Sequence, residues 1–347
     1  MSKHDRPQNA GTIGIARPAA ELMTWEAMNI ALDQAMAADD AMFIMGEDVG
    51  LIGGTYRVTQ GLYAKYGEWR VRDTPISENS FTGLAVGAAL AGGRPVVEIM
   101  TVNFALLALD ALVNMAAKLR YMSGGQLAVP MVVRMPGGVA KQLGAQHSQR
   151  LEHTLMNVPG LRIVVPATPQ DAYWQLSQAV RDVDPIIVLE HELLYFTKGP
   201  FDRDAAAPPL HSAVVRRAGG HMTLIAWSRM MQVCLAAAED LAKDKIEVEV
   251  IDLRSLRPID LPLLQASLAK THRALVVEED CRFAGAGAEI VAALSEASFF
   301  DLEAPIGRVA GADVPTPYNG ALEAASIPDA ARVTAMVRAV LGGELAS

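Results

Sequence analysis

The sequence predicts an α/β protein with a mostly parallel sheet, followed by a second, smaller α/β unit. Apolar runs of strand length alternate with helical patterns along the chain, which is typical of a parallel sheet covered by helices. Several runs, such as 130–135 and 185–190, are continuously apolar, as expected for strands buried on both faces. Periodicity lapses between 197 and 211, and this lapse separates the two units.

The first unit is expected to alternate strands and helices from residue 25 onwards. Its expected strands cover 41–45, an extended stretch at 71–76, 95–100, 130–135, 161–165 and 185–190. Its expected helices cover 25–36, 55–66, a segment through Phe81 to Ala88, 104–121, 149–157 and 169–181.

The second unit repeats the alternation on a smaller scale. Strands are expected at 222–227, 246–251, 274–278 and 306–310, and helices at 230–243, 260–269, 285–297 and 329–341. The predicted division of the chain is therefore a flexible arm at 1–22, a first domain at 23–200, a linker at 201–212 and a second domain at 213–347.

Composition narrows the class of protein. The 347 residues are 51% hydrophobic and 20% charged, enough for two folded domains with large cores. A net charge of −9 argues against nucleic acid or an anionic membrane surface as partner. Two cysteines without metal-ligand spacing indicate a reducing, intracellular setting. The start of the chain lacks a signal-like apolar region, so a bacterial cytoplasmic location is expected.

The stretch at 73–92 holds one carboxylate, Glu78, between a turn and an apolar helix. Pro75 fixes its own φ and favours an extended chain before it, and Ser77 or Ser80 is a candidate N-cap. Gly83 and Gly87 lie four residues apart. Because glycine costs about 1 kcal/mol inside a helix, their presence predicts a face where another backbone or helix packs closely.

Candidate site residues follow the ends of the expected strands. Glu47 follows the first strand, Glu78 follows the extended 71–76 stretch, Met100 ends the next strand, and His147 lies in the loop after 130–135. Ligands of open α/β sheets bind beyond the carboxyl ends of the strands. With Phe104 one helical turn past Met100, this edge has the side chains to grip a heteroaromatic ligand and move protons.

Each residue taken singly has a plainer interpretation. A histidine in a glycine-rich loop is most often a surface residue, Met100 and Phe104 are more often core, and Glu47 beside Asp48 is usually solvated. The sequence lacks a Walker A loop, a G-x-S-x-G elbow and HExxH. It also lacks the Gly-Asp-Gly and Asn-Asn pair with which a thiamine diphosphate enzyme holds Mg²⁺ and diphosphate.

Three motifs carry a resemblance to a known family: Asp-Thr-Pro-Ile-Ser-Glu at 73–78, Tyr-Met-Ser-Gly-Gly at 121–125 and Ala-Gln-His-Ser-Gln at 145–149. With them the chain resembles the β subunits of the thiamine diphosphate-dependent 2-oxo acid dehydrogenases, most closely the pyruvate dehydrogenase type. The match runs from about residue 22 to the end. It implies a transketolase-like fold, with a pyrimidine-binding domain followed by a smaller C-terminal domain.

The resemblance implies partners as well. An α subunit is expected to supply the missing motif and hold Mg²⁺, in a tetramer of two α and two β chains with thiamine diphosphate between the chains. The C-terminal domain is expected to meet the lipoyl acyltransferase core, which accepts the acetyl group.

Site roles follow from the resemblance, residue by residue. Glu78 is expected to hydrogen-bond N1′ of the cofactor's aminopyrimidine, with Glu47 behind it and Phe104 packed on the ring. Ile76, Met100 and Phe104 are expected to bury Glu78 and so raise its pKa. His147 is expected to orient substrate and assist acyl transfer. A structural K⁺ site is expected at the largely backbone oxygens of Met131, Ala179, Val180, Asp182 and Asp184.

Two departures from the family pattern bear on substrate identity. Leu107 stands where pyruvate-type relatives commonly have a polar residue, and Lys141-Gln142-Leu143 precedes the histidine where smaller residues are more common. Acetoin or branched-chain 2-oxo acids therefore stay open as alternative substrates. An alternative of another class is a non-catalytic structural subunit, which would have no need of both Glu78 and His147 at strand ends.

Overall fold

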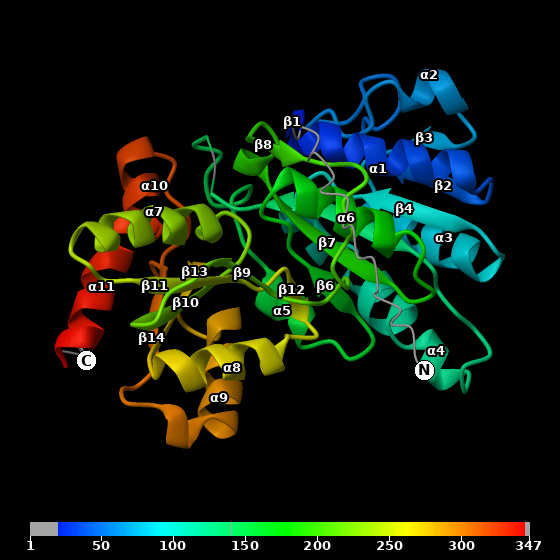
Figure 1. Cartoon of the computed structure of the whole chain (residues 1–347). Coiled ribbons are helices and arrows are strands. Elements are labelled where there is room, and N and C mark those ends of the chain that lie inside the picture. Colours follow the sequence, from blue (N-terminus) through cyan, green and yellow to red (C-terminus); the bar gives the residue numbers. More distant parts are fainter. Residues whose placement is uncertain (1–19, 140, 344–347) are drawn as a thin grey trace, which may run out of the picture.

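The computed structural model describes residues 20–139 and 141–343. These residues form two α/β halves, each built around its own sheet, which lie side by side (Figure 1). The larger sheet has seven strands in the order β12-β6-β7-β5-β4-β2-β3, and every pair is parallel except β12 with β6. Its strands are β2 (Met42–Gly46), β3 (Val71–Asp73), β4 (Arg94–Glu98), β5 (Val132–Gly137), β6 (Arg162–Val164), β7 (Ile186–His191) and β12 (Ser255–Arg257).

Side chains alternate between the two faces of this sheet, as the period of a strand requires. Ile44 and Val96 lie in the core beneath α1 and α6, whereas Met45 and Val97 lie in the core on the opposite face. Both faces are covered, which explains the continuously apolar strands. The helical segments of this half are α1 (Thr24–Ala38), α2 (Leu62–Tyr66), α3 (Glu78–Leu90), η1 (Val102–Leu106), η2 (Asp110–Ala116), α4 (Leu119–Met122), α5 (Glu152–Met156), α6 (Pro169–Ala179) and η3 (Glu192–Leu194).

The second sheet has five strands in the order β14-β13-β10-β11-β9, with β9 antiparallel to β11 and the others parallel. Helices α7 and α11 cover one face, and α8 and α9 cover the other (Figure 1). The elements are β9 (Val214–Arg217), β10 (Met222–Ala226), α7 (Met230–Lys243), β11 (Val248–Asp252), α8 (Leu261–Thr271), β13 (Ala274–Cys281), α9 (Ala286–Ala297), η4 (Phe299–Asp301), β14 (Gly307–Gly311), α10 (Gly320–Ser326) and α11 (Ala330–Gly342).

Local sequence explains where the long helices begin. Thr168 caps α6 by accepting the N–H of Asp171 at 3.1 Å, and proline occupies the first turn, where its missing N–H costs nothing. Asp329 caps α11 in the same way by accepting the N–H of Arg332 at 2.8 Å. Ser77 is the N-cap residue of α3, but its side chain makes no capping hydrogen bond.

Two predicted helices are wrong in extent. Of 55–66, only α2 is helical, because Gly53, Gly54 and Gly61 adopt positive φ values that hold the preceding chain in turns. The segment 104–121 is not one α-helix. It divides into the 3₁₀ turn η1, the π-helical η2 and the short α4.

The predicted arm and linker also need correction. Residues 1–19 lie outside the described residues, but Ala20–Met23 forms β1, which pairs antiparallel with β8 (Lys198–Phe201). This pairing satisfies backbone groups that a free arm would leave to water. The expected linker therefore starts inside a strand. From the other half of the chain, β12 crosses over to extend the larger sheet.

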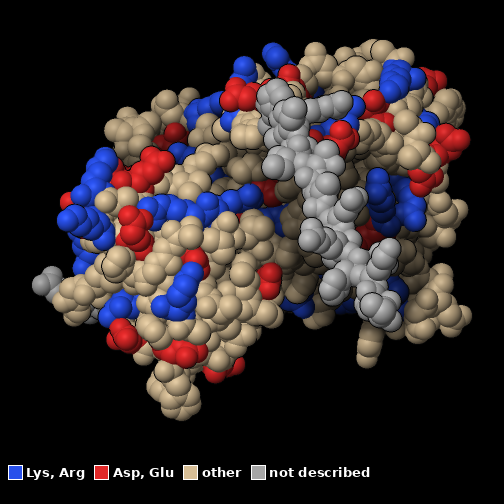
Figure 2. All heavy atoms as spheres, in the orientation of Figure 1, with Lys and Arg blue, Asp and Glu red and all other residues tan. Residues whose placement is uncertain are grey.

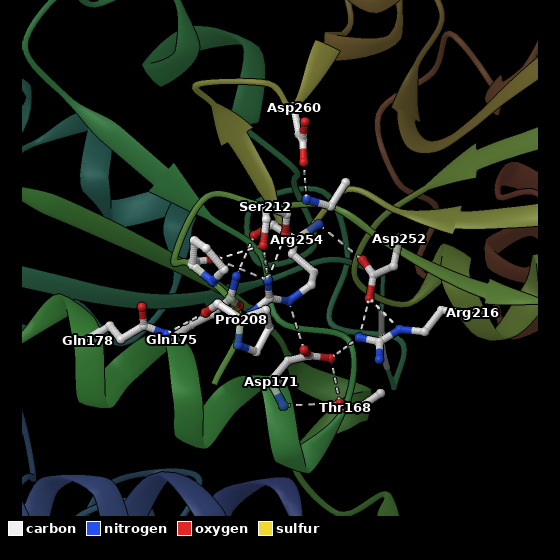
Figure 3. A network of polar contacts seen from close by, with 12 residues as sticks. Thr168, Asp171, Gln175, Gln178, Pro208, Ser212, Arg216, Asp252, Arg254 and Asp260 are labelled. Atoms are coloured by element: carbon white, nitrogen blue, oxygen red, sulfur yellow. Dashed lines mark hydrogen bonds and ion pairs between the residues drawn. The ribbon is translucent and has the colours of Figure 1, made fainter. Parts of the chain in front are cut away.

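A buried ionic network joins the two halves at this crossing (Figure 3). Arg254, fully buried, donates from Nε to Asp171 Oδ1 of α6 at 2.8 Å and from Nη1 to the carbonyl of Ser212 at 2.7 Å. Arg216 of β9 donates to Asp252 Oδ2 at 2.8 Å and also bonds Asp171. Burial, with the negative charge of Asp171, raises the pKa of Asp252 to about 6. The contacts fix the segment between the halves to both of them.

Charges of both signs are mixed on the visible surface (Figure 2). In Figure 2 basic and acidic side chains are interspersed rather than gathered by sign. Within 20–139 and 141–343, no helix is long and apolar enough to cross a membrane.

Candidate active site

The structure brings the predicted site residues towards one edge of the larger sheet. Strands β5, β4, β2 and β3 are parallel neighbours in that order, so their carboxyl ends share one edge. Glu47 follows β2 directly, Glu78 opens α3 after β3, and Met100 lies two residues past β4. His147 lies in the long loop after β5. The edge therefore collects side chains separated by 100 residues of sequence.

Glu47 and Glu78 form a buried carboxyl pair at this edge. Their exposed fractions are 6% and 2%. Burial raises the pKa of Glu47 to about 7, and the charges of Glu78 and Asp48 and a hydrogen bond with Glu78 contribute in the same direction. Glu47 Oε1 has no hydrogen-bond partner among the described residues. Glu47 therefore keeps its proton to a higher pH than a solvated glutamate does, and one of its buried oxygens stays available.

Backbone contacts fix the turn that carries Glu47. Gly46 lets β2 lie close to β4, since a Cβ there would come within 2.4 Å of the Glu98 carbonyl. Gly50 N–H donates to Asp73 Oδ1 at 2.6 Å, and Thr74 N–H donates to the Gly46 carbonyl at 2.9 Å. These bonds tie the turn after β2 to the end of β3, and so bring Glu47 to the start of α3.

An aromatic pair forms the open side of the site. Phe104 of η1 is half-buried and meets the exposed His147 edge-on, with ring centroids 5.4 Å apart. Asn103 Nδ2 donates to Gln149 Oε1 at 2.7 Å, which fastens η1 to the segment that carries His147. The edge-on contact places the two rings side by side at the open rim of the site.

The predicted burial of Glu78 by its neighbours is wrong for one residue. Ile76 is 85% exposed, because it lies in the irregular segment between β3 and α3 and not on a strand face. Met100 is half-buried. Ile76 therefore faces outward and does not bury Glu78 within the described chain.

The two departures from the family pattern lie close to this edge. Leu107 follows η1, is 60% exposed, and donates its N–H to the Phe104 carbonyl at 3.0 Å. Lys141 Nζ lies 5.4 Å from the centroid of the Phe196 ring. Leu107 therefore lies in the turn that carries Phe104, and Lys141 lies in the same loop as His147.

A buried charged cluster joins β4, β5 and β7, and it was not predicted from the sequence. Arg134 of β5 donates from Nη1 to Glu98 Oε2 at 2.6 Å, and from Nε and Nη2 to the two Glu190 oxygens at 2.8 and 2.6 Å. Tyr195 hydroxyl also donates to Glu190. Each of three apolar strands contains a charged residue, and a buried charge is stable only when it is paired. This pattern could have predicted the cluster.

Four of the five predicted K⁺ ligands lie at the end of α6 and in the turn after it, whereas Met131 precedes β5 and its carbonyl accepts the Ile186 N–H at 3.0 Å. The carbonyls of Val180 and Asp182 accept hydrogen bonds from Arg94 Nη1 at 3.3 and 3.2 Å. Each oxygen keeps a second lone pair, but a bound cation would share both oxygens with a guanidinium. The Asp182 and Asp184 carboxylates already bind Arg162 and Arg120. The K⁺ site stays a prediction.

Comparisons with known proteins agree with this architecture. Residues 20–198 match the family model for the transketolase pyrimidine binding domain, and residues 211–333 match the transketolase C-terminal domain. Among solved structures, a split-gene transketolase described as an inactive β4 tetramer aligns with a TM-score of 0.75 at 24% identity, covering 93% of this chain and 99% of that one. A Pichia stipitis transketolase aligns at a TM-score of 0.67 with 13% identity, covering 94% of this chain and 47% of that one. At these levels of identity, the two structural alignments show a shared fold and nothing further.

Curated relatives are more similar in sequence. The pyruvate dehydrogenase E1 component subunit β of Gracilaria tenuistipitata var. liui is 47% identical, over 88% of this chain and 95% of that protein. The mitochondrial subunit β-2 of Oryza sativa subsp. japonica is 46% identical, over 93% of this chain and 88% of that protein. A chloroplastic subunit β-3 of Arabidopsis thaliana is 44% identical, over 93% of this chain and 79% of that protein.

Proposed function

We propose a function from the premise that this chain belongs to the family of pyruvate dehydrogenase E1 component β subunits. It acts in the thiamine diphosphate-dependent oxidative decarboxylation of pyruvate, with transfer of the acetyl group to a lipoyl domain of the acyltransferase. The observation that carries this proposal is the buried Glu47–Glu78 pair at the carboxyl edge of β2 and β3.

The residues present fit the aminopyrimidine of thiamine diphosphate. A buried carboxyl pair with an unpartnered oxygen suits a heteroaromatic edge that exchanges protons. The half-exposed Phe104 ring suits its flat face. Glu78, Glu47, Phe104, Met100 and Ile76 are the residues proposed to hold this ring.

The cofactor, when bound, supplies the acidic thiazolium carbon and the electron sink for decarboxylation. Glu78 holds a proton between its carboxyl group and the ring nitrogen N1′. The pKa of Glu47 is raised to about 7, so Glu47 can donate a hydrogen bond to Glu78. Glu78 then does not carry an isolated buried charge after its own proton moves to N1′. His147, exposed beside Phe104, orients the 2-oxo acid and assists the transfer of the acetyl group.

The site needs a second chain to be complete. Glycines of α3 support this: a Cβ on Gly83 or Gly87 would meet no described atom within 4 Å, and Leu84 beside them is 57% exposed. The close packing that these glycines predict is thus not made within the described chain. We propose that an α subunit covers this edge, holds Mg²⁺ and the diphosphate, and forms a tetramer of two α and two β chains.

A second substrate class has one supporting observation. Leu107, 60% exposed beside the Phe104 turn, offers an apolar contact to a branched side chain, so 3-methyl-2-oxobutanoate is the alternative to pyruvate. A bacterial cytoplasmic location is kept as part of the proposal. Some relatives are named mitochondrial or chloroplastic. Fractionation of the source cells therefore tests the proposed location.

The test is ferricyanide reduction with pyruvate, 2-oxobutanoate, 3-methyl-2-oxobutanoate and acetoin as substrates. The chain is assayed alone and co-expressed with an α-type subunit, with and without thiamine diphosphate and Mg²⁺. Activity with pyruvate only when both chains and the cofactor are present is the expected result. Activity of this chain alone, or no activity with any substrate, would overturn the proposal.

A further inference from the structure

The segment 141–149, which carries His147, has little packing of its own. Gly144 and Ser148 are buried in it, and its other seven residues are exposed. A half-open pocket of about 650 Å³ lies between the two halves, and Ala145, Gln146 and Ser148 of this segment line it. A segment that borders a pocket is positioned by individual polar contacts more than by a packed core.

The larger domain provides polar contacts at the two ends of this segment. After β5, Gly138 N–H donates to the Gln149 carbonyl at 3.0 Å, and Asn103 holds the Gln149 side chain at 2.7 Å. These contacts fix the neck of the loop. They leave the stretch from Lys141 to Gln146, which leads to His147, without a described hydrogen bond to β5 or η1.

The smaller, C-terminal half supplies the remaining contacts. Glu323 Oε1 of α10 accepts the Gln142 N–H at 2.9 Å. Thr316 Oγ1 donates to the Ser148 carbonyl at 3.3 Å. Closer to β5, Glu279 Oε1 of β13 accepts the Val139 N–H at 2.6 Å. Three positions along the segment and its approach are thus tied to residues far ahead in the sequence.

Backbone conformation makes the Glu323 contact important. Lys141 and Gln142 have φ values of +58° and +59°, a region that residues other than glycine adopt at a cost and keep only when their surroundings hold them. The Glu323 side chain is only 9% exposed, and its carboxylate bonds the amide of the second of these residues. A charged acceptor forms the stronger kind of hydrogen bond.

Glu279 is a second, more deeply embedded contact. It is 8% exposed and also bonds His191 Nε2 at 2.9 Å. Burial opposes its ionisation, but His191, Arg150 and the Val139 N–H lower its pKa to about 2. The carboxylate is therefore ionised at neutral pH and a constant acceptor. Its many partners make it a poor site for a test by substitution.

We propose that Glu323, from the C-terminal half, is a positioning residue for His147: it holds the strained Lys141–Gln142 turn so that the imidazole stays beside Phe104. This proposal rests on the proposed function, because His147 acts there on the 2-oxo acid and the acetyl group. It gives the smaller domain a part in the reaction apart from binding a partner.

The experiment compares Glu323→Ala with Glu323→Gln in the assembled α–β enzyme. Alanine removes the acceptor, whereas glutamine keeps a side-chain oxygen within reach of Gln142 N–H. We expect Glu323→Ala to lower acetyl transfer to a lipoyl domain about tenfold or more, as small misplacements of reacting groups do, and Glu323→Gln to restore most of the rate. The Kd for thiamine diphosphate should stay unchanged, because Glu47, Glu78 and Phe104 lie on other elements.

A double-mutant cycle separates positioning from general damage. In a His147→Ala background, Glu323→Ala should lower acetyl transfer no further than about twofold, because the group it positions is gone. The exposed Glu296 of α9 provides the control, and Glu296→Ala should leave the rate unchanged. If Glu323→Ala fails to assemble, Glu323→Asp, which keeps the charge and shortens the reach, replaces it in the cycle.

The outcomes distinguish this proposal from the function it rests on. A wild-type enzyme inactive on every 2-oxo acid would overturn the function. An active wild type with an unaffected Glu323→Ala variant, or with effects of Glu323→Ala and His147→Ala that multiply in the double variant, would overturn only the positioning role.

Discussion

Replacement of Glu47 by glutamine should stabilise the isolated chain, and more so at alkaline pH. The folded structure raises the pKa of Glu47 from 4.5 to about 7, first through burial and then through the charge of Glu78. Between these two values the folded chain binds more protons than the unfolded chain. Stability therefore falls as the pH rises through this window. Glutamine has the same shape and no proton to lose, so the variant avoids this loss.

The magnitude follows from the two pKa values. At 1.36 kcal/mol per unit, the ionisation of Glu47 costs the folded state about 2 kcal/mol at pH 6 and about 3 kcal/mol at pH 8.5. The difference, on the order of 1 kcal/mol, corresponds to roughly 2 °C in Tm for a chain of this length. Any constant effect of the substitution, such as an altered hydrogen bond to Glu78, cancels when the two pH values are compared.

The assay is thermal unfolding of the isolated chain, followed by circular dichroism at both pH values. The difference in Tm between Glu47→Gln and wild type should be about 2 °C more positive at the higher pH. Glu68, exposed and on the same half, provides the control: Glu68→Gln should give the same difference at both. An equal Tm difference for Glu47→Gln at the two pH values would refute the assignment of a shared proton to this pair.

Three further predictions concern the junction of the domains, a tight turn and the cation site. Arg254→Met leaves the buried Asp171 carboxylate with one charged partner fewer and should destabilise the chain by about 3 kcal/mol in urea unfolding; a loss below about 1 kcal/mol would contradict it. Gly160→Ala places a Cβ 1.9 Å from the Ala117 carbonyl at a φ of +98° and should cost about 2 kcal/mol or more, whereas Gly61→Ala, at +81° with open space, should cost about 1 kcal/mol. If K⁺ binds at the turn after α6, its replacement by tetramethylammonium at equal ionic strength should lower Tm, and an unchanged Tm would remove K⁺ from the account.

The sequence predicts a parallel sheet and the edge at which its strands end, but it does not predict the order of the strands. Alternating elements indicate a parallel sheet, and a parallel sheet brings the residues after its strands to one edge. Glu47, Glu78 and His147 could therefore be grouped without a structure. The exposure of Ile76 could not be predicted, because the segment between β3 and α3 has no periodicity from which to assign a face.

Sequence patterns do not predict contacts between segments that lie far apart in the chain. Strand β12 has three residues, too few to show a period, and joins a sheet whose other strands come from the first half. The bonds from Glu323 to Gln142 and from Glu279 to Val139 join residues 181 and 140 positions apart. A single carboxylate in a helix or strand carries no local sign of such a distant partner.

Glu78→Gln removes the proton that Glu78 is proposed to share with the cofactor's ring. The measurement is ferricyanide reduction with pyruvate by the assembled α–β enzyme saturated with thiamine diphosphate and Mg²⁺, alongside sedimentation of the assembly. The variant is expected to assemble as the wild type does but to lose turnover by a factor of about 10² or more. Retained turnover in the assembled variant would contradict the role of Glu78 in proton sharing and, with it, the function proposed for the buried carboxyl pair.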